Sequence, residues 1–203
     1  MTQDATRGPE PSAEDRRFGE RARSAAHRPA LAVSGPYGRP VHPLLVTVPI
    51  GAWVSAVAFD IASLTVEGRA YGRAAQWLVA IGVVAGIVAA IFGFLDSRRL
   101  TKGTRAYKVA MTHMTLMGVA LALFVVSFLL RRADADLFLD GTPLLAFGVA
   151  VVGLVVLIGG AWLGGRLTYG FGARVADEED QLRGHLLEAP LDADPDQRST
   201  TSD

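Results

Sequence analysis

Four long apolar blocks alternate with short polar links through the middle of the chain. They cover about residues 43–66, 75–96, 109–130 and 143–165. A membrane-spanning helix needs about 20 mostly apolar residues, and each block is long enough to form one. The pattern therefore predicts an all-α fold, an integral membrane four-helix bundle within residues 41–175.

The two ends of the chain lack such blocks. Residues 1–40 are rich in Arg, Glu, Ala, Pro and Gly without a periodic apolar face, and residues 176–203 are acidic and polar. Segments of this composition bury too little apolar surface to offset the entropy lost on ordering. Both ends are therefore predicted to be disordered tails.

Small residues recur along the second and fourth blocks. The second contains Gly82, Gly86 and Gly93, and the fourth contains glycines at 148, 153, 159, 160, 164 and 165. Small residues let helix backbones approach each other closely in lipid. We therefore expect the bundle to pack through these two helices.

The distribution of Lys and Arg predicts the orientation of the bundle. Near the ends of the blocks, one side of the membrane collects ten of these residues, and the other side only Arg69, Arg73, Arg131 and Arg132. The side richer in Lys and Arg normally stays in the cytoplasm. Both termini, and the basic link between the second and third helices, are therefore predicted to be cytoplasmic.

Composition narrows the classes of function. The formal net charge is zero and cysteine is absent. A balanced charge gives no reason to expect nucleic acid as a partner, and a chain without thiols has no cysteine nucleophile, thiolate metal site or iron–sulfur cluster. No Ser-His-Asp arrangement or HExxH segment is present, so no catalytic residue is predicted and a non-enzymatic role is favoured. Lipid is the expected environment, and assembly into an oligomer stays open.

Ionisable residues inside the blocks form two layers, and the outer one holds Asp60 and Arg131. Asp60 follows His42 by eighteen residues, and Arg131 follows His113 by the same interval, which corresponds to five helical turns. The first and third helices run parallel, so an ion pair between Asp60 and Arg131 is predicted if their polar faces meet. Such a pair is expected to fix helix packing, with a proton or ion pathway as the alternative.

The inner layer, toward the predicted cytoplasmic side, holds His42, Asp96 and His113, and it allows four interpretations. Two histidines on facing helices, His42 and His113, can ligate a b-type haem. All three residues can bind a divalent metal, because imidazole and carboxylate suit iron, zinc or manganese. Asp96 can instead orient His113 as a proton-handling pair. The fourth interpretation is a hydrogen-bonded lock between helix ends.

The chain resembles a bacterial membrane family catalogued as domain of unknown function 2231. The resemblance covers about Gly38 to Val175 and rests on His42-Pro43, Pro49 to Trp53, Phe59-Asp60, Gly93 to Asp96, His113 and Trp162 to Gly172. It implies a four-helix, multi-pass protein of the bacterial cytoplasmic (inner) membrane, and it points to Asp60, Asp96 and the two histidines. Some members are joined to Rieske-type iron–sulfur modules, which implies a redox setting.

Two functions of different classes follow. The first is a small polytopic inner-membrane protein of unassigned activity that binds haem or a metal as an accessory of a membrane redox complex. The second is a purely structural or regulatory membrane subunit whose buried polar residues only lock helix packing. A small transporter is disfavoured, because the sequence has no obvious inverted repeat or paired broken helices of the kind used in alternating access.

Overall fold

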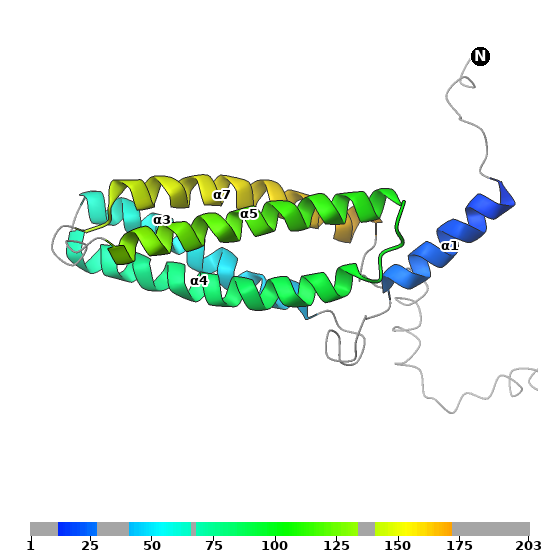
Figure 1. Cartoon of the computed structure of the whole chain (residues 1–203), viewed down its shortest axis with the longest axis horizontal. Helices are drawn as coiled ribbons and strands as arrows, with labels where there is room; N and C mark the ends of the chain where they lie inside the picture. The colour runs from blue at the N-terminus through cyan, green and yellow to red at the C-terminus, as the bar shows by residue number, and fades with distance from the viewer. Residues whose placement is uncertain (1–11, 28–40, 66–67, 134–140, 172–203) are drawn as a thin grey trace, which may run out of the picture.

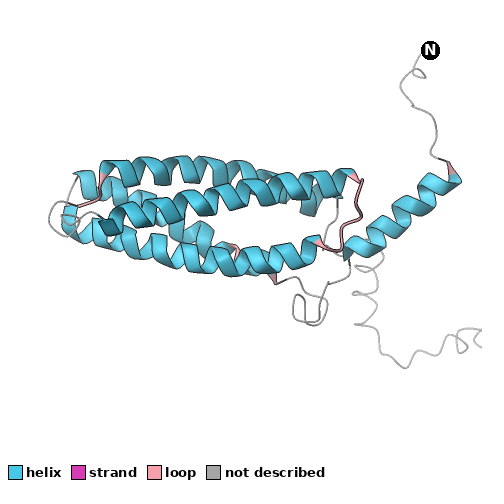
Figure 2. Cartoon of the chain, viewed as in Figure 1, coloured by secondary structure: helices cyan, strands magenta, loops and turns pink. Residues whose placement is uncertain are grey.

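The computed structural model describes residues 12–27, 41–65, 68–133 and 141–171. Within these residues the chain is almost entirely helical and contains no strand (Figure 2). Four helices are long and apolar enough to cross a membrane, by length and composition: His42–Thr65, Gly68–Ser97, Arg105–Ala133 and Leu144–Gly170. The predicted all-α membrane bundle is therefore confirmed.

The first span consists of two helices, α2 (His42–Leu45) and α3 (Thr47–Thr65). Pro43 lies in the first turn of α2, where its missing N–H removes no helical hydrogen bond. Pro49 lies in the first turn of α3 and has no N–H to donate to the carbonyl four residues earlier. This missing donor accounts for the interruption of the helix at Val46.

The next two helices are longer than the apolar blocks predicted. α4 (Gly68–Ser97) begins seven residues before the expected start at 75, and α5 (Arg105–Ala133) extends beyond both ends of the third block. Hydropathy marks only the apolar part of a helix, whereas these helices continue through polar turns. Arginine forms helices well and can carry its charge away from the apolar region on a long side chain. The fourth span is α7 (Leu144–Gly165), followed by the π-helical turn η3 (Arg166–Gly170).

A further helix, α1 (Ala13–His27), occupies part of the predicted N-terminal tail. Ser12 Oγ accepts a hydrogen bond from the Asp15 N–H at 3.1 Å, and Asp15 Oδ2 accepts one from the Ser12 N–H at 3.1 Å. This reciprocal cap satisfies two backbone donors at the helix start. The prediction of a disordered tail rested on apolar periodicity, which does not register this capping signal. The other residues of the two predicted tails, apart from Ser12, lie outside the described part of the chain.

The four spans run antiparallel in chain order (Figure 1). α3 packs along α4, α5 packs along α7, and α4 also contacts α5. The bundle is therefore made of two helical hairpins, α3–α4 and α5–α7, which have the same direction. Residues 98–104 join the two hairpins at the end that is expected to face the cytoplasm.

An aromatic pair occupies the centre of the core. The rings of Trp53 and Phe124 are stacked, with centroids 4.1 Å apart and planes at 4°, and both side chains are buried. Trp53 lies directly over Gly82, and a Cβ atom on Gly153 would come within 3.1 Å of the Phe124 ring. These glycines of α4 and α7 therefore make room for the central rings.

Only some of the glycines pack as the sequence predicts. Gly86 faces Trp53 and Leu121, and Gly160 faces Met117. By contrast, open space surrounds the position of a Cβ at residues 148, 159 and 165. The prediction of close packing through α4 and α7 thus holds for one face of α7, and the remaining glycines of that helix lie away from the bundle.

Candidate functional site

Asp60 and Arg131 form a fully buried ion pair. The Nη1 and Nη2 atoms of Arg131 donate to the two carboxylate oxygens of Asp60 at 2.7 and 2.6 Å, and neither side chain is exposed. Thr142 Oγ1 donates a third hydrogen bond to Asp60 Oδ1 at 2.8 Å. Arg131 Nε donates to Ser127 Oγ at 3.4 Å. The structure thus brings together the two residues that the equal spacing predicts to pair. The hydroxyls of Thr142 and Ser127 also contact the pair, and the spacing did not predict them.

A glycine turn places Thr142 next to the ion pair. Gly141 has φ +96°, a conformation that glycine adopts without a steric penalty. Its backbone lies against Gly68 at the start of α4, and a Cβ on Gly72 would come within 3.0 Å of it. This close approach places the residues that precede α7 over the start of α4. Thr142, only 6% exposed, can then reach Asp60.

The geometry of the pair favours a fixed bridge over a proton pathway. A guanidinium that binds a carboxylate through two parallel hydrogen bonds has a defined orientation. Each charge is paired with the other within the bundle. The Thr142 hydroxyl donates a further hydrogen bond to the carboxylate. The Ser127 hydroxyl also donates to the Ala146 carbonyl at 2.8 Å, which connects α5 to α7. The outer layer therefore joins α3, α5 and α7.

The two histidines of the inner layer are each held by a hydrogen bond to a backbone carbonyl. His42 Nδ1 lies 2.9 Å from the carbonyl oxygen of Ala89, and His113 Nδ1 lies 2.8 Å from that of Gly160. A carbonyl oxygen only accepts, so Nδ1 carries the proton and, in the neutral ring, Nε2 has the lone pair. Both imidazoles are half-buried.

Glycines face both imidazole rings. A Cβ on Gly93 would come within 2.9 Å of His42 Cε1, and a Cβ on Gly164 within 3.1 Å of His113 Cε1. Each imidazole therefore lies close to a helix at a point where that helix has no side chain. The carbonyl contact and the glycine together restrict each imidazole to one orientation.

The two hairpins form an internal repeat with an interval of 71 residues. The interval relates the histidines, their carbonyl acceptors and the glycines that face them, namely His42 and His113, Ala89 and Gly160, and Gly93 and Gly164. The central rings and the ion pair follow the same interval, and in both cases the counterparts touch each other. Residues on a two-fold axis contact their own counterparts. The central contacts therefore lie along an approximate axis that relates the hairpins.

Asp96 does not follow the repeat, because the position 71 residues later is Leu167. The Asp96 side chain is half-buried at the end of α4. His42 lies within the range of electrostatic interaction with both Asp96 and His113. Across the described ranges, however, no group of three His, Asp or Glu side chains is close enough to hold a metal ion. The described residues thus do not bring His42, Asp96 and His113 together as a group of three.

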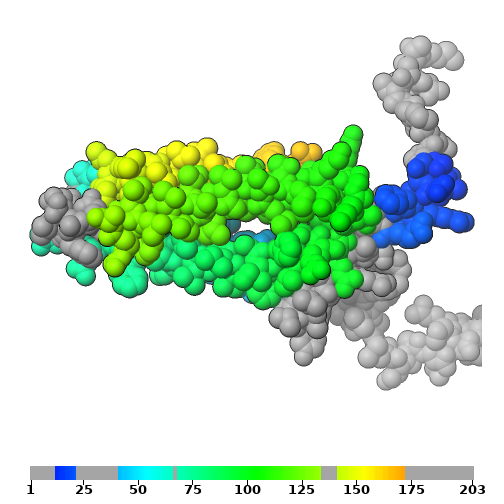
Figure 3. Space-filling view, viewed as in Figure 1, coloured from blue at the N-terminus to red at the C-terminus, as the bar shows by residue number. Residues whose placement is uncertain are grey.

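A hollow lies beside the inner layer. In the space-filling view, an opening separates α4 from α5 in the half of the bundle nearer their connecting link (Figure 3). That half contains both histidines, since His42 begins the first span and His113 lies two turns into α5. The histidines precede the central rings by eleven residues, which is about 16 Å along a helix.

The described helices thus define a class, that of small polytopic membrane proteins built from two antiparallel hairpins around buried polar layers. The family model "Predicted membrane protein (DUF2231)" matches residues 38–177, and the chain belongs to this family. The match confirms the resemblance seen in the sequence. No curated protein and no solved structure matches the chain.

Proposed function

We propose that this protein is a haem protein of the bacterial cytoplasmic membrane, in which His42 and His113 ligate one b-type haem. In this proposal it carries electrons as an accessory of a membrane redox complex. The observation that carries the proposal is the matched anchoring of two histidines at equivalent positions of the two hairpins.

The hydrogen bonds of the imidazoles support ligation. A histidine that binds iron usually donates its other ring N–H to a carbonyl or carboxylate, which fixes the tautomer and the ring orientation. His42 and His113 both have this partner on Nδ1, so each can present Nε2 to a ligand. Cofactor sites in helix bundles are commonly built from side chains on facing helices. Haem iron held by two imidazoles would supply one-electron transfer at such a site.

Small residues surround both histidines, as a bulky ligand bound beside them requires. Gly93 and Gly164 let the imidazoles approach their helices closely, and Ala89 and Gly160, whose carbonyl oxygens accept the imidazole hydrogen bonds, are also small. The hollow between α4 and α5 lies in the same half of the bundle (Figure 3). The stacked pair of Trp53 and Phe124 would close the site toward the membrane centre.

A structural or regulatory subunit is the second candidate. It is favoured by the enclosed Asp60–Arg131 pair, which joins helices and leaves no charge unpaired. In that case the histidine–carbonyl hydrogen bonds only hold each hairpin together. The two candidates make different predictions about colour, because only the first requires a chromophore.

An optical spectrum distinguishes them. Protein purified in mild detergent from haem-replete cells is measured oxidised and after dithionite reduction, with metal analysis of the same sample. We expect a b-type spectrum that is lost in His42→Ala and in His113→Ala and retained in the matched variant His27→Ala. A colourless protein that contains stoichiometric iron, zinc or manganese would instead indicate a divalent-metal site. A colourless, metal-free protein would support the structural role.

A further inference from the structure

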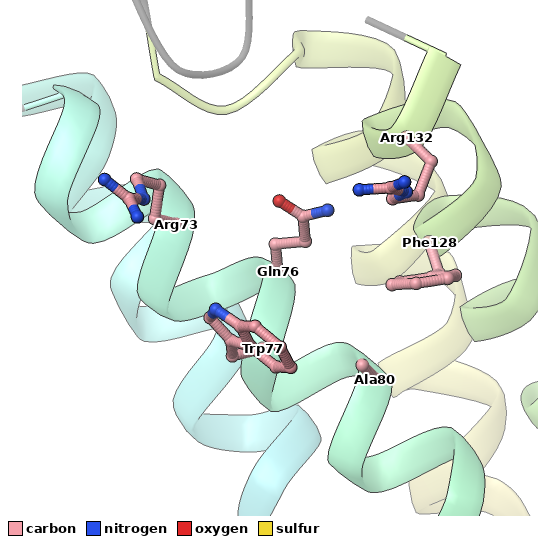
Figure 4. Close-up of a pocket in the computed structure, with 6 residues that line it drawn as sticks. All are labelled: Arg73, Gln76, Trp77, Ala80, Phe128 and Arg132. Atoms are coloured by element: carbon pink, nitrogen blue, oxygen red, sulfur yellow. The ribbon is translucent and has the colours of Figure 1, made fainter.

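A second site lies at the opposite end of the bundle, between α4 and α5. It is a pocket of about 250 Å³ lined by Arg73, Gln76, Trp77, Ala80, Phe128 and Arg132 (Figure 4). We call it the interfacial pocket. It is remote from the histidines, since its residues come from the start of α4 and the end of α5. Nothing in the haem proposal uses it.

The mouth of the interfacial pocket is polar and cationic. The Gln76 amide and the Arg132 guanidinium point toward each other across it (Figure 4). Gln76 is only 9% exposed, so its amide is a fixed part of the wall. Arg73 lies one turn before Gln76 and Trp77, on the far side of the amide in this view. The neighbouring Arg131 adds no net charge, because Asp60 neutralises it.

The floor of the interfacial pocket is apolar and continues along α4. Trp77, Ala80 and Phe128 lie below the polar mouth (Figure 4). A second groove of about 370 Å³ shares Trp77 and Ala80 and extends past Ile81, Val84 and Ala85. These residues follow one face of α4 toward the middle of the span. A cationic mouth at the helix end therefore leads into an apolar groove that points into the membrane.

We propose that the interfacial pocket binds one anionic phospholipid. Its phosphate would lie between Arg132 and the Gln76 amide, within reach of Arg73, and one acyl chain would follow the apolar groove. Arginine suits this role because its planar donors match phosphate oxygens, often two at a time. Trp77 is 69% exposed at the end of the span, the position where tryptophan anchors helices at the membrane surface. A phospholipid without net negative charge would bind less tightly, because the two arginines attract it less.

Quenching of Trp77 fluorescence by brominated lipid tests this proposal. The chain has three tryptophans, of which Trp53 is 3% exposed and Trp162 is 74% exposed. In a Trp162→Phe background, Trp77 is thus the only tryptophan that lipid can reach. The protein is reconstituted into phosphatidylcholine vesicles containing phosphatidylglycerol. The acyl bromine is placed on either lipid at the same overall composition.

We expect bromine on phosphatidylglycerol to quench Trp77 about two- to fivefold more per lipid than bromine on phosphatidylcholine. Arg73→Gln with Arg132→Gln should reduce this ratio to about one. The matched variant Arg69→Gln removes the same kind of charge at the same end, on an exposed residue outside the pocket, and should retain the ratio. In the unsubstituted pocket, high salt should lower the ratio, because salt screens exposed charges.

Three results would overturn the proposal. They are a ratio of one before any arginine is changed, a ratio that survives the double substitution, and an equal loss in Arg69→Gln, which would indicate general surface charge. The salt titration needs no substitution, so it tests the site even if the double variant fails to fold. Haem binding is measured separately and does not affect these outcomes.

Discussion

Asp60→Asn isolates the contribution of the buried ion pair. The substitution preserves the size of the side chain but removes the negative charge that Arg131 faces from both Nη atoms. Whichever way the new amide turns, one Nη then meets an NH₂ donor instead of an acceptor. Breaking a buried pair from one side leaves an uncompensated charge and costs about 3–5 kcal/mol. We expect a loss of that size in the free energy of unfolding.

The internal repeat adds a sharper expectation for the exchanged pair, Asp60→Arg with Arg131→Asp. Positions 60 and 131 are counterparts, so the exchange should rebuild the two parallel hydrogen bonds in the opposite sense. It forfeits the Thr142 hydrogen bond to the carboxylate at position 60. A hydrogen bond to a charged group is worth about 1.5–3 kcal/mol. The exchanged pair should therefore be less destabilised than Asp60→Asn.

Reversible unfolding in mixed micelles, followed by circular dichroism, measures these free energies. Arg69→Gln is the matched control, because it removes an exposed arginine at the same end of the bundle that lies outside both the buried pair and the interfacial pocket, and its effect should stay within about 0.5 kcal/mol. An exchanged pair as unstable as Asp60→Asn would contradict the equivalence of positions 60 and 131. An Asp60→Asn variant that behaved like the control would contradict the contribution of the ion pair to stability.

Three smaller predictions concern single contacts. Thr142→Ala should cost about 1–3 kcal/mol in the same unfolding assay, because it removes a donor to the Asp60 carboxylate; no loss would mean that this hydrogen bond is dispensable. Gly82→Ala should cost about 1–3 kcal/mol because its Cβ meets the Trp53 ring, whereas Gly148→Ala meets open space and should be tolerated; equal effects would contradict the packing. The Ser12 side-chain and backbone hydrogen bonds lower the pKa of Asp15, so the cap is present above the ordinary carboxyl pKa and is lost as pH falls through the lower, folded value. Protection of the α1 amides from exchange should fall over that acid range, and Ser12→Ala should weaken this pH dependence, because only the backbone N–H bond to the carboxylate remains.

Hydropathy and spacing predicted the bundle and one of its two polar layers. The four apolar blocks became the four spans, because a membrane helix must be apolar over about 20 residues. The equal interval from His42 to Asp60 and from His113 to Arg131 predicted the outer pair, since both helices run in the same direction. The ends of the helices could not be predicted as well, because polar turns such as Arg69 to Arg73 continue α4 without an apolar signal.

The hydrogen bonds of Asp60 and of the histidines to groups on other segments could not be predicted from the sequence, because they depend on which carbonyl or hydroxyl lies nearby in the fold. Thr142 reaches Asp60 only because a glycine turn folds over α4, and no periodicity in the sequence encodes that approach. The histidine contacts could not be predicted for a related reason, since their acceptors are backbone carbonyls on other helices. The 71-residue interval was visible in the sequence, as Gly82 and Gly153 or Gly93 and Gly164 show. A search for internal repeats would have identified Trp53 and Phe124 as counterparts, but not their stacking.

The central claim is that His42 and His113 act together as ligands of one haem. The most direct measurement is the haem content of purified protein by pyridine haemochrome assay, combined with electron paramagnetic resonance of the oxidised sample. We expect one haem per chain with a low-spin signal from two imidazole ligands, and loss of that signal in either His42→Ala or His113→Ala. Haem absent from protein made in haem-replete cells, or a low-spin signal that survives both substitutions, would contradict the central claim.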